Sequence, residues 1–289
     1  MQIGIGLPNT PPGATGGLMV EWARRSESAG FSTLGTIGRI VYDNYEELIS
    51  LAAAAGATQR IGLMTTVLVA PPRNEVMLAK QAATLDAISG GRFTLGIGVG
   101  GREDDARATG AEFRNRGARM ERQIQTMRRI WSGEKLGDGV GAIGPKPVTE
   151  NGPLLVLGGN TPRAMERAAR LGDGFISTPN TPDAIKEQFQ QVEKAWRDAG
   201  KSGKPYFAGG MYFALGGDET VQKGRDYARH YYTFAGEQVQ EIVAGSVLPD
   251  ADTIKGTIRA LEDAGMDEVI MWPTVADINQ VDLLAAVVR

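Results

Sequence analysis

Strand-like and helix-like segments alternate along this 289-residue chain, and this alternation limits its fold more than any other feature. The clearest unit begins with an apolar, β-branched run at residues 61–69 that stops at two prolines. A helix is predicted over 75–88, and a second strand over 93–97 leads into a glycine-rich loop at 98–101. Parallel strands need a crossover connection of this kind, usually a helix. The unit therefore predicts two neighbouring strands of a parallel sheet, and the loop after the second strand carries few side-chain atoms.

The same alternation continues over the rest of the chain. Eight strands are predicted, at residues 3–7, 33–37, 61–69, 93–97, 154–157, 174–177, 207–215 and 268–272. Helices are predicted at 18–29, 44–55, 75–88, 118–131, 162–171, 184–199, 218–247, 253–264 and 282–288, with Asp43 or Asn44 as the N-cap of the second. Eight such units fit one (β/α)8 TIM barrel over residues 1–289, with an insertion around 133–152 and a helical excursion around 218–250. A doubly wound open sheet is the alternative from the pattern alone.

Composition excludes several classes of function. A formal charge of -3 and a pI of about 5.5 argue against nucleic acid, which needs a concentrated basic face. The chain has no cysteine and one histidine, so a metal site built from its side chains and a Ser-His-Asp triad are not expected. Apolar runs are shorter than the roughly 20 residues of a membrane span, and the first residues are already a strand. We expect a cytoplasmic protein without a secretory signal.

A phosphate site is predicted after the fifth strand, at Gly158-Gly159-Asn160-Thr161-Pro162. Active sites of TIM barrels lie at the carboxyl ends of the strands. The two glycines leave backbone N–H groups accessible, Thr161 suits an N-cap, and Pro162 suits the first helical position. The following helix then directs its positive end at an anion. An ordinary strand-to-helix turn needs the same residues, so the motif alone leaves both interpretations open.

Three ordered segments carry a family resemblance, namely AKQAATLDAISGGRFTLGIGVGG (79–101), RGARMERQIQTMRRIWSG (116–133) and LLVLGGNTPRAMERAARLGDGFIS (154–177). The chain resembles the bacterial luciferase-like family of flavin- and deazaflavin-dependent oxidoreductases. The resemblance implies a barrel that binds FMN or coenzyme F420, with a non-proline cis peptide between Thr66 and Val67. It implies that loop 98–101 borders the ring and that 158–161 holds the phosphate. The cofactor-binding residues that we predict are Asn9, Thr66, Val67, Val69, Gly98, Val99, Gly100, Gly158, Gly159, Asn160 and Thr161.

Two departures from the family pattern affect the substrate side. Gly101 stands where one branch has a glutamate base, and Gly38-Arg39 stands where many relatives have an Asp-His pair. Arg39 is our candidate catalytic residue, since a permanent cation suits an anionic substrate or negative charge on a flavin. A surface salt bridge is the alternative for Arg39. The lone His230 fits a packed or solvated helix position, and Trp272 stands at a strand end where it can line a pocket.

The predicted function is an oxidoreductase or monooxygenase that acts on a small organic substrate. Hydride transfer and oxygen activation at reduced FMN both remain open. A non-catalytic barrel that stores or carries flavin is the first alternative, because the glutamate and histidine are missing. A barrel hydrolase or aldolase would need a carboxylate pair or a strand-end lysine, and neither is visible. Expected partners are a small-molecule substrate, a separate flavin or F420 reductase and a second copy in a homodimer, with no nucleic acid and no membrane.

Overall fold

Parallel strands form one closed sheet in the computed structural model, which describes residues 1–289. The strands are β1 (Gln2–Gly6), β2 (Thr33–Thr36), β3 (Gly62–Thr65), β4 (Leu68–Val69), β5 (Phe93–Gly98), β6 (Leu154–Gly158), β7 (Gly174–Ile176), β8 (Tyr206–Phe213) and β9 (Glu268–Pro273). Their order is β3-β2-β1-β9-β8-β7-β6-β5-β4, and β3 also pairs with β5, which closes the barrel. Because β3 and β4 both pair with β5, they are two halves of one strand. The predicted TIM barrel is confirmed, and the open sheet is excluded.

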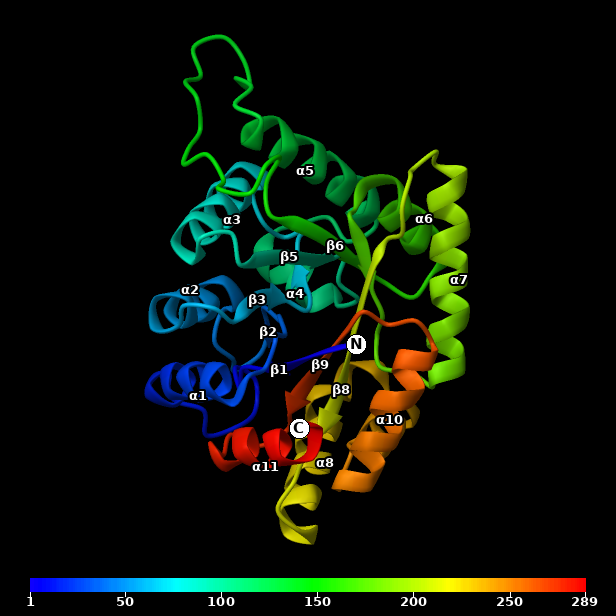
Figure 1. Ribbon diagram of the computed structural model, residues 1–289. Helices are drawn as coiled ribbons and strands as arrows, with labels where there is room; N and C mark the ends of the chain where they lie inside the picture. Colours follow the sequence, from blue (N-terminus) through cyan, green and yellow to red (C-terminus); the bar gives the residue numbers. More distant parts are fainter.

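Helices surround this sheet (Figure 1). They are α1 (Gly16–Ala29), α2 (Glu47–Ala57), α3 (Glu75–Ser89), α4 (Glu103–Thr109), α5 (Arg116–Trp131), α6 (Pro162–Leu171), α7 (Pro182–Asp198), α8 (Asp218–Tyr231), η1 (Thr233–Ala235, a 3-10 turn), α9 (Glu237–Gly245), α10 (Ala251–Asp263) and α11 (Asn279–Val288). None of them combines the length and the hydrophobicity that crossing a membrane requires.

Apolar stripes on the helices pack against the outside of the barrel. In α5, Met120, Ile124, Met127 and Trp131 recur at helical spacing, and all four are buried. The Trp131 indole N–H donates to the carbonyl of Ala79 at 3.0 Å, so the stripe also joins α5 to α3. The stripe is therefore the face of α5 that packs against the barrel.

The N-cap predicted for α2 is wrong. The helix begins at Glu47, and its cap is Glu46, whose carboxylate accepts from the Ile49 N–H at 2.7 Å. Asn44 instead donates from its side-chain amide to the carbonyl of Tyr45. The prediction followed the preference for short polar caps, whereas here a longer carboxylate reaches forward to an N–H of the first turn.

Two further segments differ from the prediction in detail. The expected helix at 218–247 is divided into α8, η1 and α9, and Gly236, with a positive φ of 88°, separates η1 from α9. Helix α4 follows the glycine-rich loop and begins with an acidic first turn at residues 103–105. The insertion around 133–152 is an irregular loop that projects beyond α3 and α5 (Figure 1). Asp86 anchors it by accepting from the N–H groups of Val148 and Thr149 at 2.7 and 2.9 Å.

Candidate functional site

A cavity of about 750 Å³ opens at the carboxyl ends of the strands. This is the end at which TIM barrels place their active sites. Eleven of the twelve predicted site residues line it, namely Arg39, Thr66, Val67, Val69, Gly98, Val99, Gly100, Gly158, Gly159, Asn160 and Thr161. The barrel thus gathers loops that are far apart in the sequence into one space.

Asn9 is the predicted residue that does not line the cavity. It is buried, and its amide donates to the carbonyls of Ile37 and Tyr45 at 2.8 and 3.2 Å. Its side-chain oxygen accepts from the Ile37 N–H at 3.3 Å. Asn9 therefore ties the end of β1 to the segment after β2, and it positions the cavity wall from behind.

The break between β3 and β4 forms one wall of the cavity. The Thr66–Val67 peptide is cis, as the resemblance implies. A Cβ added at Gly98 would lie 2.8 Å from Val67 Cγ2, and one at Gly158 would lie 3.1 Å from Val67 Cγ1. The glycines at the ends of β5 and β6 therefore make room for Val67, and the three residues together form a wall with few side-chain atoms.

Hydrogen bonds hold this break in place. The Thr66 hydroxyl donates to the carbonyl of Thr36 at 2.9 Å and accepts from the Trp272 indole N–H at 3.1 Å. The Thr65 hydroxyl donates to the carbonyl of Gly96 at 2.7 Å and accepts from the Gly96 N–H at 2.9 Å. Because both threonines bond to neighbouring strands, the wall is rigidly placed. Trp272 lines the cavity, as predicted from its place in the sequence.

The opposite end of the cavity is built around the start of α6. The Thr161 hydroxyl caps the helix by accepting from the Ala164 N–H at 3.3 Å. A Cβ at Gly159 would lie 2.5 Å from the Ala164 Cβ, so only glycine fits there without movement. The helix directs its positive end into the cavity, which suits an anionic ligand.

Charged side chains give the cavity an excess of positive charge. Six arginines line it, and Asp105 is its one acid; the arginines are Arg39, Arg102, Arg114, Arg116, Arg163 and Arg167. This lining lies in a chain whose formal charge is -3. Asp105 is buried and accepts from the Val41 N–H at 2.7 Å. The cavity therefore favours a ligand with several negative charges.

Arg39 is held firmly at the cavity wall. Its Nη1 donates to the carbonyl of Tyr231 at 2.7 Å, and its Nη2 donates to the carbonyl of Val41 at 3.3 Å. The guanidinium lies 4.2 Å from the ring centre of Tyr42, 4.8 Å from that of Tyr231 and 5.4 Å from that of Phe234. Burial lowers the pKa of Arg39, although an arginine stays charged at neutral pH. The surface salt bridge considered for this residue is absent.

The neighbouring Gly38 has a structural explanation. A Cβ at this position would lie 1.6 Å from Glu47 Oε1, so the Glu47 carboxylate fills the space a side chain would take. Glu47 is 2% exposed and pairs with Arg73, whose Nη2 lies 2.8 Å from Glu47 Oε2. The buried Glu47 carboxylate, paired with the half-buried Arg73, thus takes the place of a side chain at residue 38.

Aromatic residues from the excursion after β8 form the part of the cavity that the sequence did not predict. They are Tyr231, Tyr232 and Phe234, which lie beside Tyr212 at the end of β8. The tyrosine-rich run at 227–234 was the available signal, but it directed attention to His230. His230 is exposed, lies 5.9 Å from the Tyr42 ring centre and does not line the cavity.

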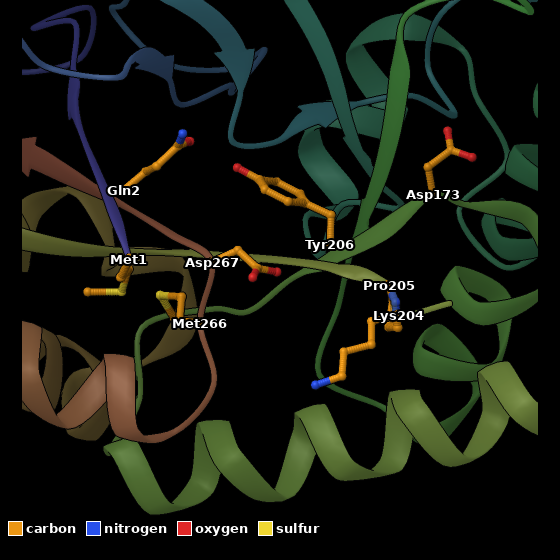
Figure 2. A pocket seen from close by; sticks show the side chains of 8 residues that line it. All are labelled: Met1, Gln2, Asp173, Lys204, Pro205, Tyr206, Met266 and Asp267. Carbon is orange, nitrogen blue, oxygen red and sulfur yellow. The ribbon is translucent and has the colours of Figure 1, made fainter. Parts of the chain in front are cut away.

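A second cavity, of about 700 Å³, lies at the amino ends of the strands. Its acids are used in structural bonds, since Asp173 accepts from the Leu155 N–H and Asp267 from the Phe207 N–H. In Figure 2 the Asp173 carboxylate and the Lys204 amine point away from each other. Groups at this end of a barrel usually serve stability, and we assign no chemistry to this cavity.

Comparison with known proteins agrees with this geometry. A family model described as luciferase-like monooxygenase matches residues 1–280. The chain belongs to this family. One relative of this luciferase-like protein is an uncharacterized protein of Mycobacterium tuberculosis, 34% identical over 164 residues, which are 54% of this chain and 58% of the relative. Another is the F420-dependent glucose-6-phosphate dehydrogenase of Nocardia farcinica, 33% identical over 139 residues, 44% of this chain and 41% of the relative. The matched segments thus cover 58% of the first relative and 41% of the second.

Solved structures share the fold over almost the whole luciferase-like chain. An F420-dependent secondary alcohol dehydrogenase in complex with an F420-acetone adduct superposes with a TM-score of 0.84 at 20% identity, over 99% of this chain and 98% of that one. A type II Baeyer-Villiger monooxygenase of Pseudomonas putida in complex with FMN gives 0.76 at 18% identity, over 99% and 95%. At these identities the likeness establishes the TIM barrel.

Proposed function

We propose that this chain is an oxidoreductase that binds a flavin or deazaflavin cofactor in the carboxyl-end cavity and acts on a small organic molecule. The observation that carries the proposal is the combination, in one cavity, of a wall with few side-chain atoms and an arginine-rich end. Such a wall admits a flat ring system, and the start of α6 with Arg163 suits a phosphate. The bound cofactor would supply the redox chemistry, while the protein supplies position and charge.

Of the two cofactors, we propose coenzyme F420 as the better fit. FMN ends in one phosphate, whereas F420 continues from its phosphate into a tail of glutamates and carries more negative charge. Arg114 and Arg163 lie exposed on the cavity lining near the starts of α5 and α6, and neither forms an ion pair or a side-chain hydrogen bond within the protein. Two uncommitted cations beside the phosphate site suit that longer anion. Relatives named for F420 support the same choice.

The experiment is a side-by-side titration of the purified protein with FMN and F420, followed by absorbance and fluorescence. We expect F420 to bind more tightly and its affinity to fall with salt, because several ion pairs would form. Tight binding of FMN alone would show that the cofactor is FMN and not F420. Oxygen consumption with reduced FMN would then test monooxygenation. Binding of neither cofactor would refute the proposed function. The separate reductase and the homodimer stay predictions.

The proposed role of Arg39 is to stabilise negative charge that develops on the ring or the substrate. Replacing it by alanine should lower the midpoint potential of the bound cofactor by roughly 30 mV, which corresponds to about 1.4 kcal/mol for two electrons. Affinity for the oxidised cofactor should change less than threefold. Spectroelectrochemical titration measures the potential, and Arg259→Ala on the exposed face of α10 is the control. An unchanged potential would leave Arg39 as an anchor for the excursion.

A further inference from the structure

The aromatic part of the cavity contains two hydroxyls that bond to each other and leave one O–H donor without a protein acceptor. The Tyr212 and Tyr232 oxygens lie 3.1 Å apart, and neither hydroxyl makes another hydrogen bond within the protein. Each phenol has one hydrogen to donate. One of the two hydrogens is used within the pair, so the other has no protein acceptor. Both residues line the cavity, and the unused donor is therefore available to a bound molecule.

The two tyrosines differ in depth. Tyr212 is 1% exposed, whereas Tyr232 is partly exposed, so Tyr232 is the member of the pair that lies nearer to a bound molecule. The Tyr212 ring centre lies 5.2 Å from that of Trp272, whose indole N–H bonds to Thr66 at the break in the third strand. The pair thus lies one aromatic ring away from the wall at which the cofactor ring is proposed to bind.

Aromatic rings form much of the surface around the pair. Tyr231, Phe234 and Trp272 contribute aromatic surface. Each terminal nitrogen of Arg39 donates to a backbone carbonyl, its guanidinium lies against aromatic rings, and its Nε is buried, so this cation is turned mainly towards the protein. A ligand that fits this space has an apolar body, which contacts the aromatic rings, and one oxygen that accepts from the unused hydroxyl. Burial raises the pKa of Tyr212 and of Tyr232, so both hydroxyls remain protonated donors at neutral and mildly alkaline pH.

We propose that the substrate is an uncharged, predominantly apolar ketone, aldehyde or alcohol whose oxygen accepts a hydrogen bond from Tyr232. Tyr212 is a positioning residue, since it holds the Tyr232 hydroxyl. The substrate class rests on the proposed function, because that function makes this space the substrate side of a redox site. The hydrogen bond itself follows from the tyrosine pair alone, and this difference allows separate tests.

The test compares two probes of nearly equal shape, acetophenone and α-methylstyrene, in which C=CH2 replaces C=O. Dissociation constants are measured by ligand-observed NMR on the full-length protein, with and without F420. Wild type should prefer the ketone about 5- to 10-fold, the effect of one well-made hydrogen bond in a buried site. Tyr232→Phe should remove the preference, and Tyr212→Phe should reduce it about two- to threefold. Tyr227→Phe is the matched control, because its hydroxyl bonds to Thr10 and does not line the cavity.

The outcomes separate the two proposals. The carbonyl also costs more to desolvate than the alkene, so the decisive quantity is the ratio of the two affinities in wild type against that in Tyr232→Phe. The same ratio in both proteins would overturn the role of the tyrosine pair even if F420 binds normally. A ketone preference that disappears only in the Tyr232 and Tyr212 variants supports the pair. If that pattern occurs in a protein that binds neither FMN nor F420, the pair stands and the proposed redox function fails. Circular dichroism of each variant checks that the fold is intact.

Discussion

Gly159→Asp should weaken cofactor binding roughly 100-fold. The substitution places a carboxylate at the start of α6, and repulsion from a phosphate about 5 Å away is worth roughly 2–3 kcal/mol in a partly solvated site. The added Cβ would also lie 2.5 Å from the Ala164 Cβ. Fluorescence titration with FMN and with F420 measures the loss.

Two companion variants separate the causes of this effect. Gly159→Ala introduces the steric conflict without the charge, so it should cost much less affinity than aspartate. Gly16→Asp introduces the same carboxylate at the first residue of another helix, α1, where a Cβ has open space. Gly16 does not line the cavity, so binding in that variant should equal wild type. Unchanged affinity in Gly159→Asp would refute the phosphate assignment at residues 158–161.

Arg73→Met should destabilise the protein by about 3–5 kcal/mol at pH 7. The substitution removes the partner of Glu47 and leaves a carboxylate uncompensated at a site that is 2% exposed. Urea unfolding measures the loss. Combining it with Glu47→Gln should recover most of the stability, because the buried charge is then gone. Arg25→Met breaks an exposed ion pair with Asp282 and should cost less than about 1 kcal/mol.

The pH dependence of Arg73→Met provides an independent check. Burial raises the pKa of Glu47, while Arg73 acts in the opposite direction. Without Arg73 the folded-state pKa rises further above the unfolded value, so the native state takes up a proton more readily than the unfolded state. The destabilisation of Arg73→Met therefore reaches its full size above the folded-state pKa of Glu47. It disappears as the pH falls towards the pKa of Glu47 in the unfolded state. A difference from wild type that stays constant between pH 8 and pH 5 would contradict this origin.

Local patterns explain why much of the fold and of the cofactor end could be predicted. The stripe on α5 and the Thr161-Pro162 start of α6 each lie within one short segment, so their period and residue types indicate the structure directly. The break after Thr66 was predicted from the family resemblance, since none of its own residues requires it.

The substrate end depends on contacts between distant segments. Arg39, Tyr212, Tyr232 and Trp272 meet only because closure of the barrel brings β2, β8 and β9 together beneath the excursion. Arg39 and Trp272 stand at or just after strand ends and could be predicted for that reason, whereas Tyr232 belongs to the excursion, where no strand end marks it. Asn9 illustrates the converse, because a polar residue at a strand end was expected to face a ligand and instead bonds to backbone.

The divided third strand contains one residue more than its partner. Leu63 pairs with Phe93, thirty residues on, but Leu68 pairs with Ile97, twenty-nine residues on. Strict alternation would put Leu63 and Leu68 on opposite faces of the sheet, yet both pack in the helix-facing core. The extra residue resets the alternation, so the outer core keeps both leucines while Val67 turns inward beside Met64. One extra residue in this strand, compared with its neighbour, therefore turns Val67 towards the cavity, and the core keeps both leucines.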